Sequence, residues 1–175
     1  IQRGAIPYFA ALHGAVVGGG LELAAAAHVR VADANTHFAL PEAQRGIFVG
    51  GGGSVNVARL MGVARMVDMM LTGRVLSAEE AERYGVVSYV TESGGARAKA
   101  MELARIAACN APLSNYAVIN ALPRIHDSGY DEGLFFESMI ATLTQVTPDA
   151  QERLRAFLDK KAPRLAIPAE RGGGA

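Results

Sequence analysis

Residues 13–54 read HGAVVGGGLELAAAAHVRVADANTHFALPEAQRGIFVGGGGS, and this stretch decides the fold. It holds two glycine clusters, Gly18–Gly20 and Gly50–Gly53, and each is followed by an apolar run of helical character. Short apolar segments bounded by glycine or proline indicate buried strands. We therefore predict strands at Tyr8–His13, Val29–Ala32 and Thr36–Leu40, with a helix beginning inside each glycine cluster.

The rest of the chain changes from mixed to purely helical character. Ser77 and Glu80 have the capping-box spacing that opens a helix, and Val86–Val90 is typical of a strand. No strand signal remains beyond residue 94. Further helices are predicted at 54–60, 63–71, 96–108, 113–125, 131–145 and 149–161. We expect an α/β core over 1–92, a helical region over 93–165 and a disordered tail over 166–175.

Composition narrows the class of protein. Half of the 175 residues are hydrophobic, enough for one buried core, and 17 basic residues balance 17 acidic ones. This balance argues against nucleic-acid and membrane-surface partners. Apolar stretches fall well short of the ~20 residues of a membrane span, and no signal peptide opens the chain. Cys109 is the only cysteine, so the chain forms no internal disulfide, which fits a reducing, cytoplasmic compartment.

The glycine clusters have two possible explanations. Glycine relieves backbone strain and lets another segment approach closely. Alternatively, the turn presents backbone N–H groups to negative charge, supported by the dipole of the following helix. Neither cluster fits a nucleotide-binding pattern, because no P-loop lysine and no G-x-G-x-x-G spacing is present. A G-x-S-x-G serine elbow is also missing.

Two carboxylates favour the functional explanation. Glu22 follows the first cluster between Leu21 and Leu23, and Glu42 follows Pro41 between other apolar neighbours. No polar helix face is available to carry Glu22 into solvent. Burial disfavours the charged form of a carboxylate, which suits proton transfer near neutrality. Two such acids beside amide-presenting turns are what acid–base chemistry on an activated carbonyl requires.

Three segments together resemble the enoyl-CoA hydratase/isomerase (crotonase) family. They are residues 13–54, MLTGRVLSAEEAERYGVVSYV at 70–90 and FLDKKAP at 157–163, in the order and with the spacing of the family. The resemblance covers nearly the whole chain. It implies an α/β fold, namely the second part of a crotonase-like ββα spiral, followed by an all-helical C-terminal oligomerisation region. It also implies homotrimers, often paired as hexamers.

The resemblance assigns roles to four residues. Gly19 matches the position whose amide forms half of an oxyanion hole for the thioester oxygen. Glu22 and Glu42 match the paired catalytic glutamates that hold one water between them, with Glu42 exchanging a proton with the α-carbon. Gly50 matches a glycine whose amide orients that water. The implied reaction is hydration of a 2-enoyl-CoA in, for example, fatty-acid metabolism. Coenzyme A is then part of the substrate, and no other cofactor and no metal is expected.

Weaker expectations concern the C-terminal helices. Lys160, Lys161 and Arg164 lie where basic residues could meet CoA phosphates of an adjacent site, although a solvated helix end explains them equally well. Four apolar residues are expected to pack in the core or between subunits, or less readily to line the acyl pocket. They are Phe135, Phe136, Met139 and Ile140. The four histidines match no catalytic position. They are His13, His28, His37 and His126.

Departures from the family pattern leave alternatives open. Val49 stands where the family usually has proline, and Ser54 where it often has threonine. The family's N-terminal half supplies the second oxyanion amide and the adenine-binding loop, and this chain begins at Ile1 without a match to either. We therefore expect the 175-residue piece alone to be inactive. Isomerisation on the same fold and a catalytically silent acyl-CoA-binding relative are the competing functions, and the acyl group is not specified.

Overall fold

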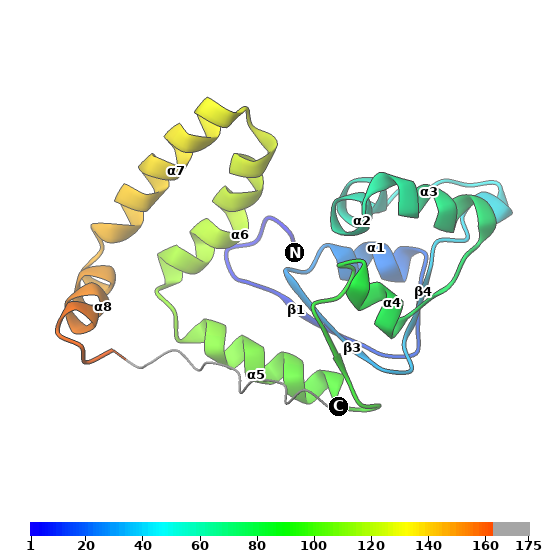
Figure 1. Cartoon of the computed structure of the whole chain (residues 1–175), viewed down its shortest axis with the longest axis horizontal. Coiled ribbons are helices and arrows are strands. Elements are labelled where there is room, and N and C mark those ends of the chain that lie inside the picture. Colours follow the sequence, from blue (N-terminus) through cyan, green and yellow to red (C-terminus); the bar gives the residue numbers. More distant parts are fainter. Residues whose placement is uncertain (163–175) are drawn as a thin grey trace, which may run out of the picture.

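The computed structural model describes residues 1–162. Six strands and their helices form an α/β part up to residue 91, and helices follow (Figure 1). The strands are β1 (Phe9–Leu12), β2 (Ala15–Val17), β3 (Val29–Asp33), β4 (His37–Ala39), β5 (Leu76–Ser77) and β6 (Tyr89–Thr91). The helices of the α/β part are α1 (Gly19–Ala25), the short η1 (Ala43–Arg45), α2 (Gly53–Met61), α3 (Val63–Thr72) and α4 (Ala78–Arg83).

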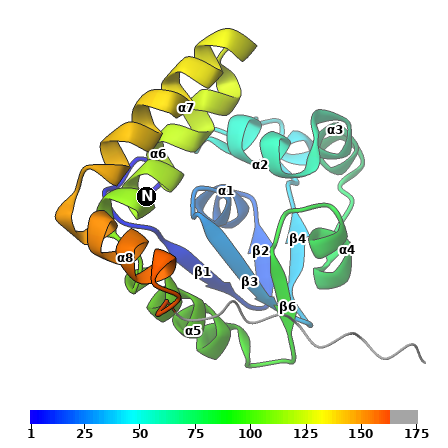
Figure 2. The same cartoon turned by 60° about the vertical axis from the view of Figure 1, so that its left-hand side comes forward.

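Two small sheets organise this part. In the first, β3 lies between β1 and β6 and is parallel to both, with Phe9 opposite Val29 and Val31 opposite Tyr89. In the second, β4 lies between β2, which is parallel, and β5, which is antiparallel. Helix α1 connects β2 to β3 and therefore passes from one sheet to the other (Figure 2). This crossing places the N-terminal turn of α1 beside the end of β4.

The main core lies among α1 to α4 and the second sheet. Leu21 of α1, Phe38 of β4 and Met69 of α3 have no exposed surface in it. A smaller cluster joins Val31 of β3 to Ala96 and Ala100 of helix α5 (Ala96–Ala108), so this helix covers the first sheet. Leu21 and Glu22 are adjacent on α1 and both buried, which means that core packing fixes the position of the glutamate.

The C-terminal helices agree closely with the sequence prediction. They are α5 (Ala96–Ala108), α6 (Pro112–Asp127), α7 (Tyr130–Gln145) and α8 (Pro148–Leu158). Helices α6 and α7 form a hairpin whose turn lies near α2, and α8 follows the C-terminal end of α7 (Figures 1 and 2). Phe135, Phe136 and Met139 on α7 are exposed in the single chain, so of the two expected roles the structure leaves contacts between subunits and not the chain's own core. The tail predicted at 166–175 lies outside the described residues.

Strand prediction failed at three short segments. The sequence analysis missed β2 and β5, which have three residues and two residues. It also placed a strand at Val86–Val90, whereas β6 begins only at Tyr89. Val86 and Val87 are buried, but their amides donate to the Ala81 carbonyl at the end of α4 and not to a neighbouring strand. An apolar run of this kind matches the sequence pattern of a buried strand, although in this structure its amides end the preceding helix.

Candidate active site

Glu22 lies in the first turn of α1 and is held by the second glycine cluster. Its side chain is 7% exposed, as the apolar sequence around it predicts. The amides of Gly51 and Gly53 donate to Oε1 of Glu22 over 2.7 Å and 2.9 Å. Two N–H donors on one oxygen fix the direction of the carboxylate and leave Oε2 for another partner. Gly51 and Gly53, which follow Glu22 by 29 and 31 positions in the sequence, thus both meet its side chain.

Glu42 lies between the end of β4 and η1 and is also 7% exposed. Its backbone carbonyl accepts hydrogen bonds from the amides of Arg45 and Ile47, which close the turn around it. Its Oε2 atom is buried and has no hydrogen-bond donor among residues 1–162. Burying an oxygen without a hydrogen-bond donor costs free energy of folding, so such groups are often found at functional sites.

Gly18 brings the two carboxylates into one neighbourhood. Its carbonyl accepts the amide hydrogen of Glu22 over 3.1 Å, and its own amide donates to Ala39 over 2.9 Å. A Cβ atom on Gly18 would lie 2.9 Å from Oε1 of Glu42. Its φ of +57° also favours glycine. The first explanation of the glycine cluster therefore applies at this residue, since it combines a left-handed backbone with a close approach.

The remaining predicted site glycines are exposed. Gly19 is the first residue of α1, and the first amides of a helix have no acceptor within the helix. Gly50 has no atom within 4 Å of a Cβ position. The amides that reach Glu22 belong to Gly51 and Gly53, and the sequence analysis did not assign either of them. The cluster itself was the available signal, but only the fold reveals which of its four amides point at the carboxylate.

The basic residues of the C-terminal segment lie elsewhere. Lys160 adopts a φ of +59°, and Lys161 contacts Asp159 over 3.4 Å. Helix α8, which precedes them, is well separated from α1 in both views (Figures 1 and 2). The structure of the single chain therefore does not bring Lys160 and Lys161 to the glutamates. Arg164 lies outside the described residues.

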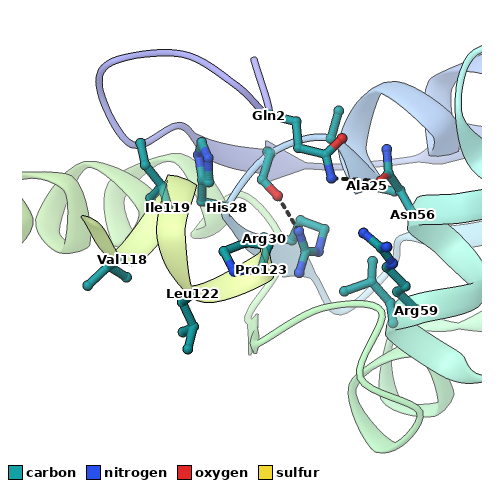
Figure 3. A pocket seen from close by; sticks show the side chains of 13 residues that line it. Gln2, Ala25, His28, Arg30, Asn56, Arg59, Val118, Ile119, Leu122 and Pro123 are labelled. Carbon is teal, nitrogen blue, oxygen red and sulfur yellow. Dashed lines mark hydrogen bonds between the residues drawn. The ribbon is translucent and has the colours of Figure 1, made fainter. Parts of the chain in front are cut away.

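A cavity of about 340 Å³ lies at the opposite, C-terminal end of α1. Arg30, Arg59 and Asn56 line it together with apolar side chains of α6 (Figure 3). His28 also lines it, and Nδ1 of its ring accepts the Tyr8 amide hydrogen over 2.9 Å. Burial lowers the pKa of His28. This hydrogen bond gives His28 a structural role, as the sequence analysis expected of the histidines.

None of the helices within residues 1–162 has both the length and the apolar character to cross a bilayer. The same residues contain no group of three or more histidine, cysteine, aspartate or glutamate side chains placed to hold a metal ion.

Comparison with solved structures defines the fold class. The chain is 57% identical to a putative enoyl-CoA hydratase from Rhodopseudomonas palustris, with a TM-score of 0.89, over 92% of this chain and 62% of that one. The protein thus has a crotonase fold, followed by helices. The family model described as enoyl-CoA hydratase/isomerase matches residues 1–166. The chain belongs to the enoyl-CoA hydratase/isomerase family.

Curated relatives agree with this assignment. A probable enoyl-CoA hydratase of Mycobacterium bovis is 36% identical over 163 residues, which are 91% of this chain and 62% of the relative. The (E)-benzylidenesuccinyl-CoA hydratase of Thauera aromatica is 36% identical over 157 residues, or 90% of this chain and 61% of the relative. The chain thus spans about three fifths of the length of the relatives that it matches.

Proposed function

We propose that the protein adds water to a 2-enoyl-CoA thioester and forms a 3-hydroxyacyl-CoA. The observation that carries this proposal is the pair of buried carboxylates on either side of Gly18. Glu22 is oriented by two amides, and Glu42 has a buried oxygen without a donor among residues 1–162. In a pair of acids that differ in this way, one is suited to directing a water molecule and the other to transferring a proton.

The family resemblance implies which step each residue carries out. The water oxygen bonds to the β-carbon while Glu22 takes one proton from that water. The electron pair of the double bond moves toward the thioester oxygen, where the amide of Gly19 stabilises the enolate; losing one such donor typically lowers the rate by about 10²–10³. Glu42, which starts protonated, delivers its proton to the α-carbon, and the proton taken up by Glu22 then returns to Glu42, so that both side chains are restored. Gly50 is proposed to orient the water through its amide. The sum is one water added across one double bond.

The finer features of the proposal follow the family resemblance. Coenzyme A enters as part of the substrate, and no separate cofactor is needed. Lys160, Lys161 and Arg164 are proposed to meet its phosphates at the site of an adjacent subunit in a homotrimer or hexamer. Exposed apolar residues on α7, including Phe135 and Met139, suit subunit contacts of this kind. A cytoplasmic location fits a chain whose only cysteine, Cys109, is a free thiol.

The test is loss of the conjugated enoyl thioester absorbance when the full-length gene product meets crotonyl-CoA. We expect rapid loss, and a fall in kcat of about 10²-fold or more in Glu22→Gln and in Glu42→Gln. Glu79→Gln is the matched control, because Glu79 is an exposed surface glutamate. Unchanged turnover in either site variant would overturn the assigned roles.

Isomerisation is the second candidate, and product analysis separates it from hydration. A 3-hydroxyacyl-CoA product supports the proposal, and a shifted double bond without added water contradicts it. The presence of both glutamates favours hydration, because the family's isomerases often work without a carboxylate at the position of Glu22. CoA binding without turnover of any enoyl-CoA would instead support a silent acyl-CoA-binding protein.

A further inference from the structure

Arg30 is a buried cation with an unusual set of partners. It lies on β3, its side chain is 6% exposed, and no carboxylate within residues 1–162 forms an ion pair with it. Burial lowers the pKa of its guanidinium. A buried charge without a counter-ion is costly, so the side chain must be needed for what it does bind.

Both hydrogen-bond acceptors of Arg30 are backbone carbonyls. Nε donates to the carbonyl of Val86 over 2.6 Å, and Nη1 donates to the carbonyl of Ala27. Ala27 follows the C-terminal end of α1, where the last carbonyls lack helical partners and the helix dipole is negative. Val86 belongs to the segment that follows α4. The planar guanidinium therefore joins the end of α1 to a separate part of the core.

Helix α1 needs such an attachment. It has seven residues, too few to be stable or fixed in place by its own hydrogen bonds. Its N-terminal turn carries Glu22 and is held by the amides of Gly51 and Gly53. Its C-terminal end is held by Arg30 at the wall of the cavity (Figure 3). The two attachments together determine where Glu22 lies along the helix axis.

We propose that Arg30 is a positioning residue for Glu22, which acts by fixing the C-terminal end of α1 through Ala27. The inference rests on the proposed function, because Glu22 matters for turnover only if it directs the water. A shift of about 1 Å in a catalytic group can cost about 10²-fold in rate. Loss of the Arg30 side chain therefore lowers turnover although Arg30 touches neither carboxylate.

Arg59 provides the matched control. It lines the same cavity (Figure 3), but it is half exposed and pairs with Asp127 over 2.7 Å, so it joins α2 to α6 and not to α1. In the full-length gene product, Arg30→Ala is expected to lower kcat by about 10- to 100-fold with KM changed less than about threefold. Arg59→Ala is expected to keep kcat within about twofold. Guanidinium at non-denaturing concentration should restore part of the kcat of R30A and leave R59A unchanged.

A second readout does not depend on turnover. The NMR chemical shifts of the Gly51 and Gly53 amides report their hydrogen bonds to Glu22. Both chemical shifts should change in R30A and stay unchanged in R59A. If R30A does not fold, Arg30→Lys carries the test, because lysine keeps the charge but cannot match the guanidinium fork. R30K should lose at least about tenfold in kcat and shift the same resonances.

The outcomes separate the two proposals. A wild-type protein without hydratase activity would contradict the proposed function, and the glycine resonances would then decide the role of Arg30 alone. A folded R30A with kcat within about twofold of wild type, or with Gly51 and Gly53 resonances unmoved, would overturn the positioning role. Equal recovery of the kcat of R30A by ammonium and by guanidinium would also overturn the positioning role.

Discussion

The amide of Gly53 donates its hydrogen to Oε1 of Glu22 over 2.9 Å, across 31 positions of sequence. Gly53 is the first residue of α2, and Glu22 lies in the first turn of α1. Two helix N-termini therefore meet at one carboxylate, where each dipole favours negative charge. The contact also explains why the second glycine cluster is long, since the chain must pass very close to the glutamate at Gly51 and again at Gly53.

Gly53→Ala tests that close approach. A Cβ atom at this position would lie 2.8 Å from Cγ of Glu22, so the glutamate or the loop must move. We expect kcat of the full-length gene product to fall about 10- to 100-fold, while α2 still forms because alanine is a good helix former. Ser54→Ala, one exposed position further along α2, is the control and should keep its turnover. Unchanged kcat in G53A would show that the contact is unimportant.

The sequence predicted what local patterns determine. Both glycine turns, the helices after them and the burial of Glu22 and Glu42 are confirmed, because each depends on neighbouring residues. The hydrogen bonds to Glu22 were beyond prediction, since they depend on how α1 and α2 pack. Arg30 was missed for a similar reason. A single arginine in an apolar strand gives no signal of the two carbonyls that it will bind.

The capping box at α4 was predicted from sequence and is present. The Ser77 hydroxyl accepts from the amide of Glu80 over 3.2 Å, and the Glu80 side chain accepts from the amide of Ser77 over 3.1 Å. We expect Ser77→Ala to lower the free energy of unfolding by about 1 kcal/mol, because an amide at the helix start loses its acceptor. Urea unfolding measures this. Ser138→Ala, on the exposed face of α7, should cost less, and an equal loss in both variants would contradict the prediction.

Asp33 gives a prediction of pH dependence. Its carboxylate accepts the amide hydrogen of Ala96 at the start of α5 over 2.8 Å and the Thr91 hydroxyl over 3.3 Å. The backbone N–H of Ala96, together with that of Gly94, lowers the pKa of Asp33. A lowered pKa means that the ionised carboxylate stabilises the fold above the unfolded value of about 3.9, and that this stability is lost as pH falls through the lower folded value.

Asp33→Asn should therefore be less stable than wild type at pH 7, and the difference should vanish in strong acid. Urea midpoints between pH 2 and pH 7 measure this. Glu152→Gln on the exposed surface of α8 is the control and should show little difference at any pH. A difference between D33N and wild type that grows as the pH falls would have the wrong sign for this mechanism.

Replacing each of the two buried glutamates by glutamine should change the free energy of unfolding by different amounts. Glu22 meets two amide donors, and hydrogen bonds to a charged group stabilise by about 1.5–3 kcal/mol against about 0.5–1.5 for neutral ones. Glu22→Gln keeps an acceptor oxygen but weakens both bonds, so we expect a loss of about 1–2 kcal/mol. Glu42 carries a buried oxygen without a donor in the described part of the chain. Replacing this carboxyl group therefore breaks no hydrogen bond to that oxygen, and Glu42→Gln should change the free energy of unfolding by less than about 1 kcal/mol.

Urea unfolding of the full-length gene product at pH 7 measures both changes, provided that the denaturant slope stays constant. Glu79→Gln, at the exposed surface, should leave the midpoint within about 0.5 kcal/mol of wild type. An E42Q variant that keeps its stability and loses its turnover would mean that Glu42 serves the reaction and not the fold. If E42Q instead lost more stability than E22Q, Glu42 would have to be held by hydrogen-bond partners as strong as those of Glu22. The two proposed roles, directing the water and transferring the proton, would then have to be exchanged between the two acids.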